Sequence, residues 1–354
     1  MKKIDAYLAK TVLGGIGLVS LMLCGLQVFI LLVNQIDDLG RGQYNLVGAL
    51  KFVCLSLPYE VYTFFPMACL LGCLIGLGVL ASHRELVVIR ASGVAIYDVM
   101  GVITKAGIGL ILIVTLFGET VAPKLAYLAN TSKLQAISGG QSLRTAEGMW
   151  LRHQDDFIYI EAFAENNTLL NVMQFHFDDK HALRFARLIP KVTITDGKGV
   201  MHDYQQTNFN AQSTSVEHQS IAPWDIAIDA SIFEVSHLSP DELPLISLWN
   251  YVHAMKVNHQ AVSNIELSFW QRLLQPLTTW VMLLLAVPFI FGPLRSSTMG
   301  AKLLLGALVG FGFHLLNRFM GPLTTVYQLP PLLVAFGPTL IFALLGMSLM
   351  RRAR

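Results

Sequence analysis

Long apolar runs alternate with short polar connections along most of the chain. A helix needs about 20 apolar residues to cross the hydrocarbon core of a membrane. Three runs of this kind precede a long polar segment and three follow it. They are Val12–Val33, Val61–Ala81, Met100–Ala122, Leu273–Leu294, Leu303–Asn317 and Leu332–Met350. The pattern therefore predicts six membrane-spanning helices.

The polar segment between the third and fourth predicted helices has a different period. Short stretches in it are β-rich or alternate apolar and polar residues, namely Phe157–Glu161, Met173–Phe177, Val192–Thr195 and Asp225–Asp229. Asp196-Gly197 supplies a turn signal between two of them. Alternation with intervening turns predicts an all-β sandwich or barrel. Ile246–Met255 then predicts a short helix that leads back to the membrane.

The lysines and arginines of the short loops predict the orientation, because they are enriched on the cytoplasmic side. One side carries Lys2, Lys3, Lys10, Arg84, Arg90, Arg295, Lys302, Arg351, Arg352 and Arg354, whereas the other carries Arg41, Lys51 and Arg318. Both termini are then cytoplasmic and the β segment is not. We expect three parts: residues 1–124 with the first three helices, 125–264 with the β domain and its connecting helix, and 265–354 with the last three helices.

Composition supports a membrane protein and narrows the chemistry. The chain is 54% hydrophobic and 14% charged, against roughly 25% charged residues in soluble domains. A net charge of +2 is too small to indicate a nucleic-acid partner. The cysteines lie in or beside apolar runs, which argues against a disulfide scaffold. The N-terminal apolar run is longer than that of a signal peptide, and we interpret it as a retained membrane helix.

Motifs for catalysis and metal binding are not found in the sequence. It contains no Gly-x-x-x-x-Gly-Lys-[Ser/Thr] loop for nucleotides and no Gly-x-Ser-x-Gly nucleophile elbow. Most of the histidines lie in the β segment, and none forms a closely spaced ligand pair. We therefore expect no catalytic residue, no metal and no cofactor bound by this chain.

Glycines and polar residues within the predicted spans have separate interpretations. Gly72 with Gly76, and Gly306 with Gly310, have the small-x-x-x-small spacing that lets helix backbones approach closely. Glu119 and His314 are ionisable residues within spans, where such residues are candidates for function. They could relay protons, but Glu119 lies near the water interface, and His314 could equally bond across helices.

Basic residues near the outer membrane surface are candidates to contact anionic lipid head groups. They are Lys51, Lys124, Lys133 and Arg144. Simple anchoring of the helices at the interface is the alternative explanation.

The charged stretch from His83 to Gly93 lies between the second and third predicted spans, on the cytoplasmic side. On a helix, Leu86 and Ile89 with Val87 form an apolar stripe, Arg84, Glu85 and Arg90 face elsewhere, and Ser92 precedes a Gly93 cap. An acidic residue is unfavourable beside an anionic leaflet. The pattern therefore favours docking into a soluble partner over lying flat on lipid.

Four stretches resemble the lipopolysaccharide export permeases, the LptF and LptG family. They are FFPMACLLGCLIGLGVLASHRELVVIRASG (64–93), GETVAP (118–123), FIFGPLRSSTMG (289–300) and FMGPLT (319–324). The second and fourth helix regions look closer to LptG. The resemblance implies six membrane helices with a periplasmic β-jellyroll between the third and the fourth, in the bacterial inner membrane.

The same resemblance implies a function and partners. The chain would be a permease subunit of an ATP-driven exporter that extracts lipopolysaccharide from the inner membrane. It would pair with an LptF-like subunit, sit on a dimer of the ATPase LptB, and meet the single membrane helix of LptC. ATP and Mg would be bound by the ATPase, and His83–Gly93 would be the coupling helix. Leu315, Leu316 and Phe319 would line the apolar cavity.

One departure from the family pattern concerns the head group. Asp37, Asp38 and Tyr59 stand where lysines are expected in LptG-type chains. Two other functions stay open on the residues alone. One is a proton-coupled lipid transporter or flippase that uses Glu119 and His314, and the other is an envelope scaffold or sensor whose β domain binds a ligand.

Overall fold

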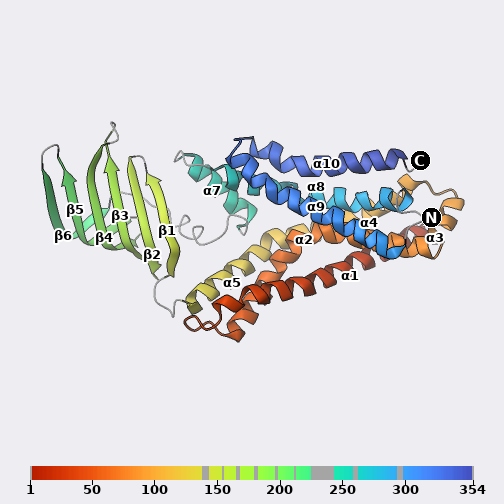
Figure 1. Ribbon diagram of the computed structural model, residues 1–354, viewed down its shortest axis with the longest axis horizontal. Helices are drawn as coiled ribbons and strands as arrows, with labels where there is room; N and C mark the ends of the chain where they lie inside the picture. The colour runs from red at the N-terminus through yellow and green to blue at the C-terminus, as the bar shows by residue number, and fades with distance from the viewer. Residues whose placement is uncertain are drawn as a thin grey trace.

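The computed structural model describes residues 2–137, 143–153, 155–164, 168–178, 182–195, 198–210, 213–224, 243–257, 262–292 and 298–352. Predicted features at Asp196-Gly197, Asp225–Asp229, Leu294, Arg295 and Arg354 lie outside these ranges. Figure 1 shows a bundle of long helices with an antiparallel sheet beyond one end of it. The chain thus has an α-helical part and an all-β part, as the sequence predicts.

Within the described residues, six helical segments are long and apolar enough to cross a membrane. The helices are α1 (Lys2–Asn34), α2 (Leu46–Ser82), α4 (Ile96–Thr120), α8 (Ser263–Phe291), α9 (Met299–Thr325) and α10 (Pro331–Arg352). The predicted number of spans is confirmed, and the chain is a multi-pass membrane protein. The fifth span is longer than its hydropathy suggests, because α9 continues through both Lys302 and Arg318.

Shorter helices connect these spans. They are the 3-10 turn η1 (Ile36–Asp38), α3 (Glu85–Ala91), α5 (Ala122–Ile137) and α7 (Leu245–Val257). The α7 helix agrees with the helix predicted at Ile246–Met255. The α5 helix, by contrast, lies at the start of the predicted β part, where its low mean hydropathy gives no membrane signal. It follows α4 directly and packs along α2.

The α2 helix is the centre of the bundle and packs against α1, α8, α9 and α5. Its glycines lie at the closest approaches. A Cβ atom placed on Gly76 would lie 2.8 Å from Val12 Cα of α1. A Cβ atom on Gly310 of α9 would lie 2.8 Å from Met67 Cγ of α2. Gly72 likewise faces Ile16, and Gly306 faces Leu74, so both glycine pairs lie in helix contacts.

The described strands form one six-stranded antiparallel sheet in which each strand pairs with the next along the chain. The strands are β1 (Leu143–His153), β2 (Asp156–Ala164), β3 (Thr168–Phe177), β4 (Leu183–Thr195), β5 (Lys198–Phe209) and β6 (Thr214–Trp224). This order is a meander, and the Greek-key pairing of a jellyroll is not found among the described strands. An inserted all-β domain is confirmed.

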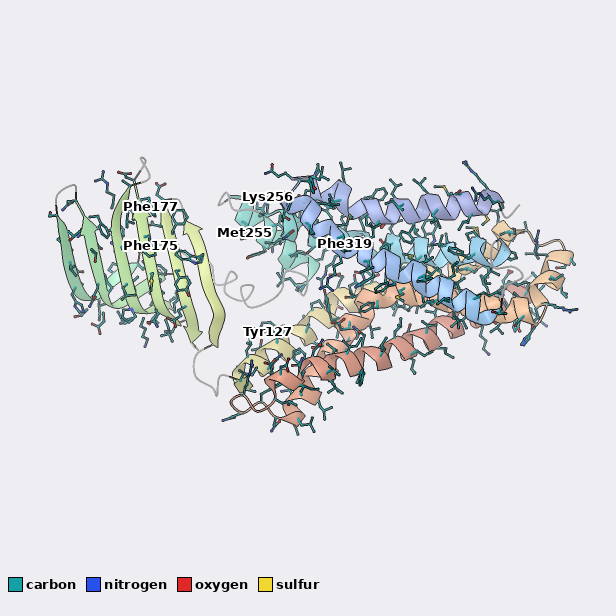
Figure 2. All side chains as sticks on the ribbon, viewed as in Figure 1. Tyr127, Phe175, Phe177, Met255, Lys256 and Phe319 are labelled. Carbon is teal, nitrogen blue, oxygen red and sulfur yellow. The ribbon has the colours of Figure 1, made fainter. Side chains whose placement is uncertain are left out.

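In β3 an apolar side chain points outward and the polar side chain next to it points into the core, which is the reverse of what alternation predicts. Met173 is 37% exposed, whereas the neighbouring Gln174 is buried. Gln174 is satisfied there because its Oε1 accepts a hydrogen bond from Trp224 Nε1 at 3.1 Å and its Nε2 donates to Asp156 Oδ1 at 3.0 Å. Figure 2 labels Phe175 and Phe177 on the same strand. A hydrogen-bonded polar residue thus occupies the core face.

The two ends of the molecule differ. In Figure 1 the sheet lies beyond one end of the bundle, while α3 and both chain termini lie at the opposite end. The chain leaves the bundle for the sheet through α5 and returns through α7. This arrangement agrees with the sidedness that the basic residues predict.

Candidate functional site

The predicted coupling helix forms a short helix, α3, between two sharp turns. Arg84 has a left-handed backbone conformation with φ 62°, and Gly93 follows the helix with φ 92°. Ser92 Oγ donates a hydrogen bond to the carbonyl oxygen of Ile89 at 2.7 Å. His83 Nδ1 lies 3.8 Å from Glu85 Oε1. The helix is therefore held tightly between α2 and α4.

The apolar stripe of α3 faces inward. Leu86 and Ile89, the expected docking anchors, are only 4% and 8% exposed and belong to the hydrophobic core of the bundle. Val87 and Val88 are 61% and 68% exposed. The assignment of the anchors is corrected accordingly, because the side chains that match the helical stripe pack onto the chain's own spans. The surface open to a partner carries the two valines.

Charged side chains surround this exposed surface. His83, Arg84 and Arg90 are exposed, and Glu85 is half-buried. The Arg90 guanidinium lies 5.8 Å from the centre of the Phe291 ring at the end of α8. The exposed part of α3 thus combines two apolar side chains with charges of both signs, which is a composition suited to binding another protein.

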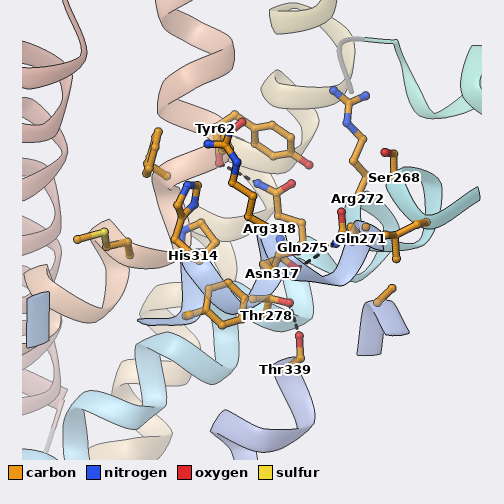
Figure 3. Close-up of a pocket in the computed structure, with 18 of the residues that line it drawn as sticks. Tyr62, Ser268, Gln271, Arg272, Gln275, Thr278, His314, Asn317, Arg318 and Thr339 are labelled. Carbon is orange, nitrogen blue, oxygen red and sulfur yellow. Dashed lines mark hydrogen bonds between the residues drawn. The ribbon is translucent and has the colours of Figure 1, made fainter. Parts of the chain in front are cut away.

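A second feature is a polar cavity of about 590 Å³ between α2, α8, α9 and α10. Figure 3 shows most of the residues that line it. The basic members are Arg272, His314 and Arg318, and none of the described lining residues is acidic. Tyr59, Tyr62, Phe64 and Phe313 contribute aromatic rings. A cavity with cationic and aromatic walls suits an amphiphilic or anionic ligand.

The walls of the cavity are joined by hydrogen bonds between helices. Gln271 Nε2 donates to Asn317 Oδ1 at 3.2 Å, and Gln275 Nε2 donates to the carbonyl oxygen of Tyr62 at 2.8 Å. The Oγ1 atoms of Thr278 and Thr339 lie 2.7 Å apart. Figure 3 shows these contacts as dashed lines. The sequence interpretation missed this set, although Gln271 and Arg272 directly precede Leu273, and Gln275 and Thr278 lie within the predicted span.

Glu119 and His314 occupy different surroundings. The Glu119 carboxylate accepts a hydrogen bond from the Tyr62 hydroxyl at 2.9 Å and lies 3.9 Å from Arg272 Nη1. His314 stacks on Phe64 with ring centroids 5.0 Å apart. Each residue thus has its own partners, and no contact between the two residues is found among the described side chains.

The basic candidates at the outer side are not equivalent. Lys51 on α2 and Lys124 on α5 are exposed. Lys133 Nζ instead lies 2.8 Å from Asp38 Oδ2 and 5.0 Å from the centre of the Phe52 ring. For Arg144 the structure describes only the backbone, in β1. Lys51 and Lys124 are therefore the open cations of this group.

Two of the three residues that depart from the family pattern, Asp38 and Tyr59, have a cation beside them. Asp38 is paired with Arg41 at 2.9 Å as well as with Lys133, whereas Asp37 is exposed. Burial, with the Asp38 carboxylate adding to it, raises the pKa of the nearby Tyr44 hydroxyl. The Tyr59 ring lies 5.4 Å from the Arg272 guanidinium. Tyr59 of α2 thus has a neighbouring cation, the Arg272 side chain of α8.

The apolar candidates on α9 divide between two faces. Leu315 is 38% exposed and Phe319, labelled in Figure 2, is 64% exposed. Leu316 packs instead against the buried cluster of Leu267, Met320, Val334 and Ala335. Exposed residues on α1 such as Leu21 and Phe29 extend the apolar surface of the bundle.

Comparison with known proteins identifies the family. A family model described as lipopolysaccharide export system permease LptF/LptG matches residues 6–352. The lipopolysaccharide export system permease protein LptG of Escherichia coli (strain K12) is 34% identical over 352 residues, covering 99% of this chain and 98% of the relative. The protein of the same name from Haemophilus influenzae is 30% identical over 353 residues, covering 99% of both. The chain belongs to the lipopolysaccharide export system permease family, LptF/LptG.

Proposed function

We propose that this chain is an inner-membrane permease subunit of a lipopolysaccharide export system, with both termini and α3 in the cytoplasm and the sheet in the periplasm. The observation that carries the proposal is the family match over residues 6–352. The arrangement of the fold supports it, because the sheet and α3 lie at opposite ends of the bundle. The chain pairs with a second permease of the family and accepts the membrane helix of an LptC-like protein.

The energy for export comes from a separate cytoplasmic ATPase dimer that binds ATP and Mg. Removing a lipid from a bilayer exposes its acyl chains at about 0.8 kcal/mol per methylene. A lipid with several chains cannot leave unaided at a useful rate. The exposed surface of α3 is the place where the ATPase docks, with Val87 and Val88 as its apolar contacts and the neighbouring charges fixing the register.

The exposed side chains of α2, α5 and α9 indicate where this chain contacts the lipid. Leu315 and Phe319 contact acyl chains, since both are apolar side chains exposed on α9. Lys51 and Lys124 contact phosphate groups of the lipid, since their charges are not paired with described carboxylates. Lys133 has a structural role through Asp38.

The decisive experiment compares two substitutions in α3. Val88→Asp changes an exposed side chain, so we expect a folded chain from which the ATPase dissociates during purification in mild detergent. ATP-driven release of lipopolysaccharide from proteoliposomes should fall about tenfold, as for loss of an interface anchor. Leu86→Asp places a charge in the core, and we expect little folded protein.

The matched control is Val216→Asp on β6, since Val216 is also 68% exposed. It should retain the ATPase and the release rate. If Val88→Asp behaved like this control, α3 would not be the docking site. If no ATPase accompanied the unsubstituted chain, the proposed function itself would fail.

A further inference from the structure

Four segments of the chain meet around the carboxylate of Glu119. Its Oε1 accepts the hydrogen bond from the Tyr62 hydroxyl of α2 at 2.9 Å. Its Oε2 accepts a hydrogen bond from the backbone N–H of Leu245 at 3.2 Å and lies 3.9 Å from Arg272 Nη1 of α8. Arg272 Nη1 also donates to the carbonyl oxygen of Leu243. Three spans, α2, α4 and α8, are thus tied to the start of α7 and the residues just before it.

The position of these contacts along the chain is informative. Glu119 is near the end of α4, where the chain leaves the bundle for α5 and the sheet. Leu243 and Leu245 lie where the chain returns from the β domain. Leu245 is 126 residues after Glu119. The exit and the return of the inserted domain are therefore held together by one carboxylate and one guanidinium.

Burial makes this cluster rigid. The side chains of Arg272 and Glu119 are 7% and 18% exposed, and Tyr62 is 3% exposed. A Cβ atom on Gly118 would collide with the Tyr62 ring, so the ring and the α4 backbone are in direct contact. A buried charge that loses its partner is strongly destabilised, and the pair therefore moves as a unit.

The α2 helix connects this cluster with α3. Tyr62 is 20 residues before Ser82, the last residue of α2, which corresponds to about 30 Å of helix at 1.5 Å per residue. Pro58 and Pro66 lie within α2 on either side of Tyr62. Proline removes a backbone hydrogen bond and permits a bend. Tyr62 thus lies in the part of α2 where bending is easiest.

We propose that Tyr62, Glu119 and Arg272 are positioning residues that form a joint between the membrane helices and the β domain. Movement of α3 reaches Tyr62 through α2, and the carboxylate and guanidinium pass it to the segment at Leu243–Leu245. The periplasmic domain then changes its position relative to the bundle in step with the cytoplasmic end. Glu119 acts in this scheme as a fixed hydrogen-bond acceptor.

The test uses the full chain in the complex that co-purifies with it. Tyr62→Phe removes the hydroxyl donor and keeps the ring, and Glu119→Gln keeps the shape but leaves one donor unmatched and removes the charge. We expect amide hydrogen exchange at Leu245 to become about tenfold faster in both variants, as for loss of a hydrogen bond to a charged group. Lipopolysaccharide released per ATP hydrolysed should fall several-fold, with assembly and hydrolysis retained.

The matched control is Glu60→Gln. Glu60 is another carboxylate of α2, and its Oε2 accepts a hydrogen bond from Gln27 of α1 at 2.7 Å. Exchange at Leu245 and the release ratio should stay at the unsubstituted level in this variant. Arg272→Lys, which keeps the charge, should retain more of the release ratio than Arg272→Gln.

Three outcomes would overturn the joint. The first is the same rate of amide hydrogen exchange at Leu245 in Glu119→Gln and Glu60→Gln. The second is faster exchange at Leu245 while the lipopolysaccharide released per ATP hydrolysed stays unchanged. The third is a loss of release that only follows a loss of assembled complex, because that marks a folding defect. The release ratio rests on the proposed function, whereas exchange does not. If no ATPase accompanied the chain, the proposed function would fail and exchange would still decide whether the contact exists.

Discussion

Single glycines set how closely the helices approach one another. Gly72 and Gly76 place the α2 backbone against Ile16 and Val12 of α1. At such positions any side chain must displace a neighbouring backbone, which cannot move aside as a flexible side chain can. Close approach also maximises dispersion contacts, which replace the hydrophobic driving force between helices in lipid.

The consequence can be measured at Gly76. We expect Gly76→Leu to separate α1 from α2 and to destabilise the chain by about 1–3 kcal/mol, the usual range for overpacking. Thermal unfolding in detergent, followed by tryptophan fluorescence, should show a lower midpoint. Gly14→Leu is the control, since a Cβ atom there meets nothing within 4 Å. Equal midpoints for the two variants would contradict the close contact.

The lysines at the end of the bundle nearest the sheet differ in their surroundings. The α5 helix is fixed to the loop after α1, because the backbone N–H of Gln43 donates to the carbonyl oxygen of Ala136 at 2.7 Å and Lys133 pairs with Asp38. Lys51 at the start of α2 and Lys124 at the start of α5 remain exposed. The two kinds of lysine should therefore respond differently to substitution.

We expect the double variant Lys51→Gln with Lys124→Gln to lower the affinity for lipopolysaccharide about tenfold, because charge-assisted hydrogen bonds to phosphate are lost. Binding to the purified complex can be measured by native mass spectrometry. Dephosphorylated lipid should show no difference between the variant and the unsubstituted chain. Lys133→Gln should instead reduce protection of α5 from hydrogen exchange. Unchanged affinity in the double variant would leave these lysines as interfacial anchors.

At the scale of the whole molecule, the proposed orientation puts the two ends of the bundle in different compartments. The basic residues of the short loops predict a cytoplasmic location for α3, and the sheet lies beyond the other end of the bundle. Under the proposed function, energy enters at the end that carries α3 and lipid leaves at the end that carries the sheet. In this scheme α2 is the covalent link between the two ends, and the proposed joint at Glu119 is the noncovalent link.

Chemical labelling can test this sidedness. In a chain whose Cys24 and Cys54 are replaced by serine, we expect Val88→Cys to react with a membrane-impermeant maleimide in inverted vesicles and not in spheroplasts. Thr214→Cys on β6 should show the opposite pattern. Labelling of both cysteines from the same side would overturn the proposed orientation.

The sequence by itself determined the number of spans, the inserted β domain and the location of α3. These properties depend on local hydropathy and period, which a bilayer and a pleated sheet impose directly. The family resemblance followed from contiguous stretches such as residues 64–93 and is confirmed by the family match. Hydropathy could not find α5 or the full length of α9, because mixed polar composition hides a helix that tertiary contacts stabilise.

Only the tertiary structure decided which face of each element is free. Leu86 and Val88 are equally apolar in the sequence, but one is buried in the bundle and the other is exposed, because α3 turns sharply at Arg84 and Gly93. Lys133 and Lys51 likewise differ, because Lys133 pairs with Asp38 and lies over the Phe52 ring, whereas Lys51 is exposed. The contacts of Glu119 with Leu245 and Arg272 join residues that are more than 100 positions apart. Such pairings depend on how the helices pack together, which no local pattern records.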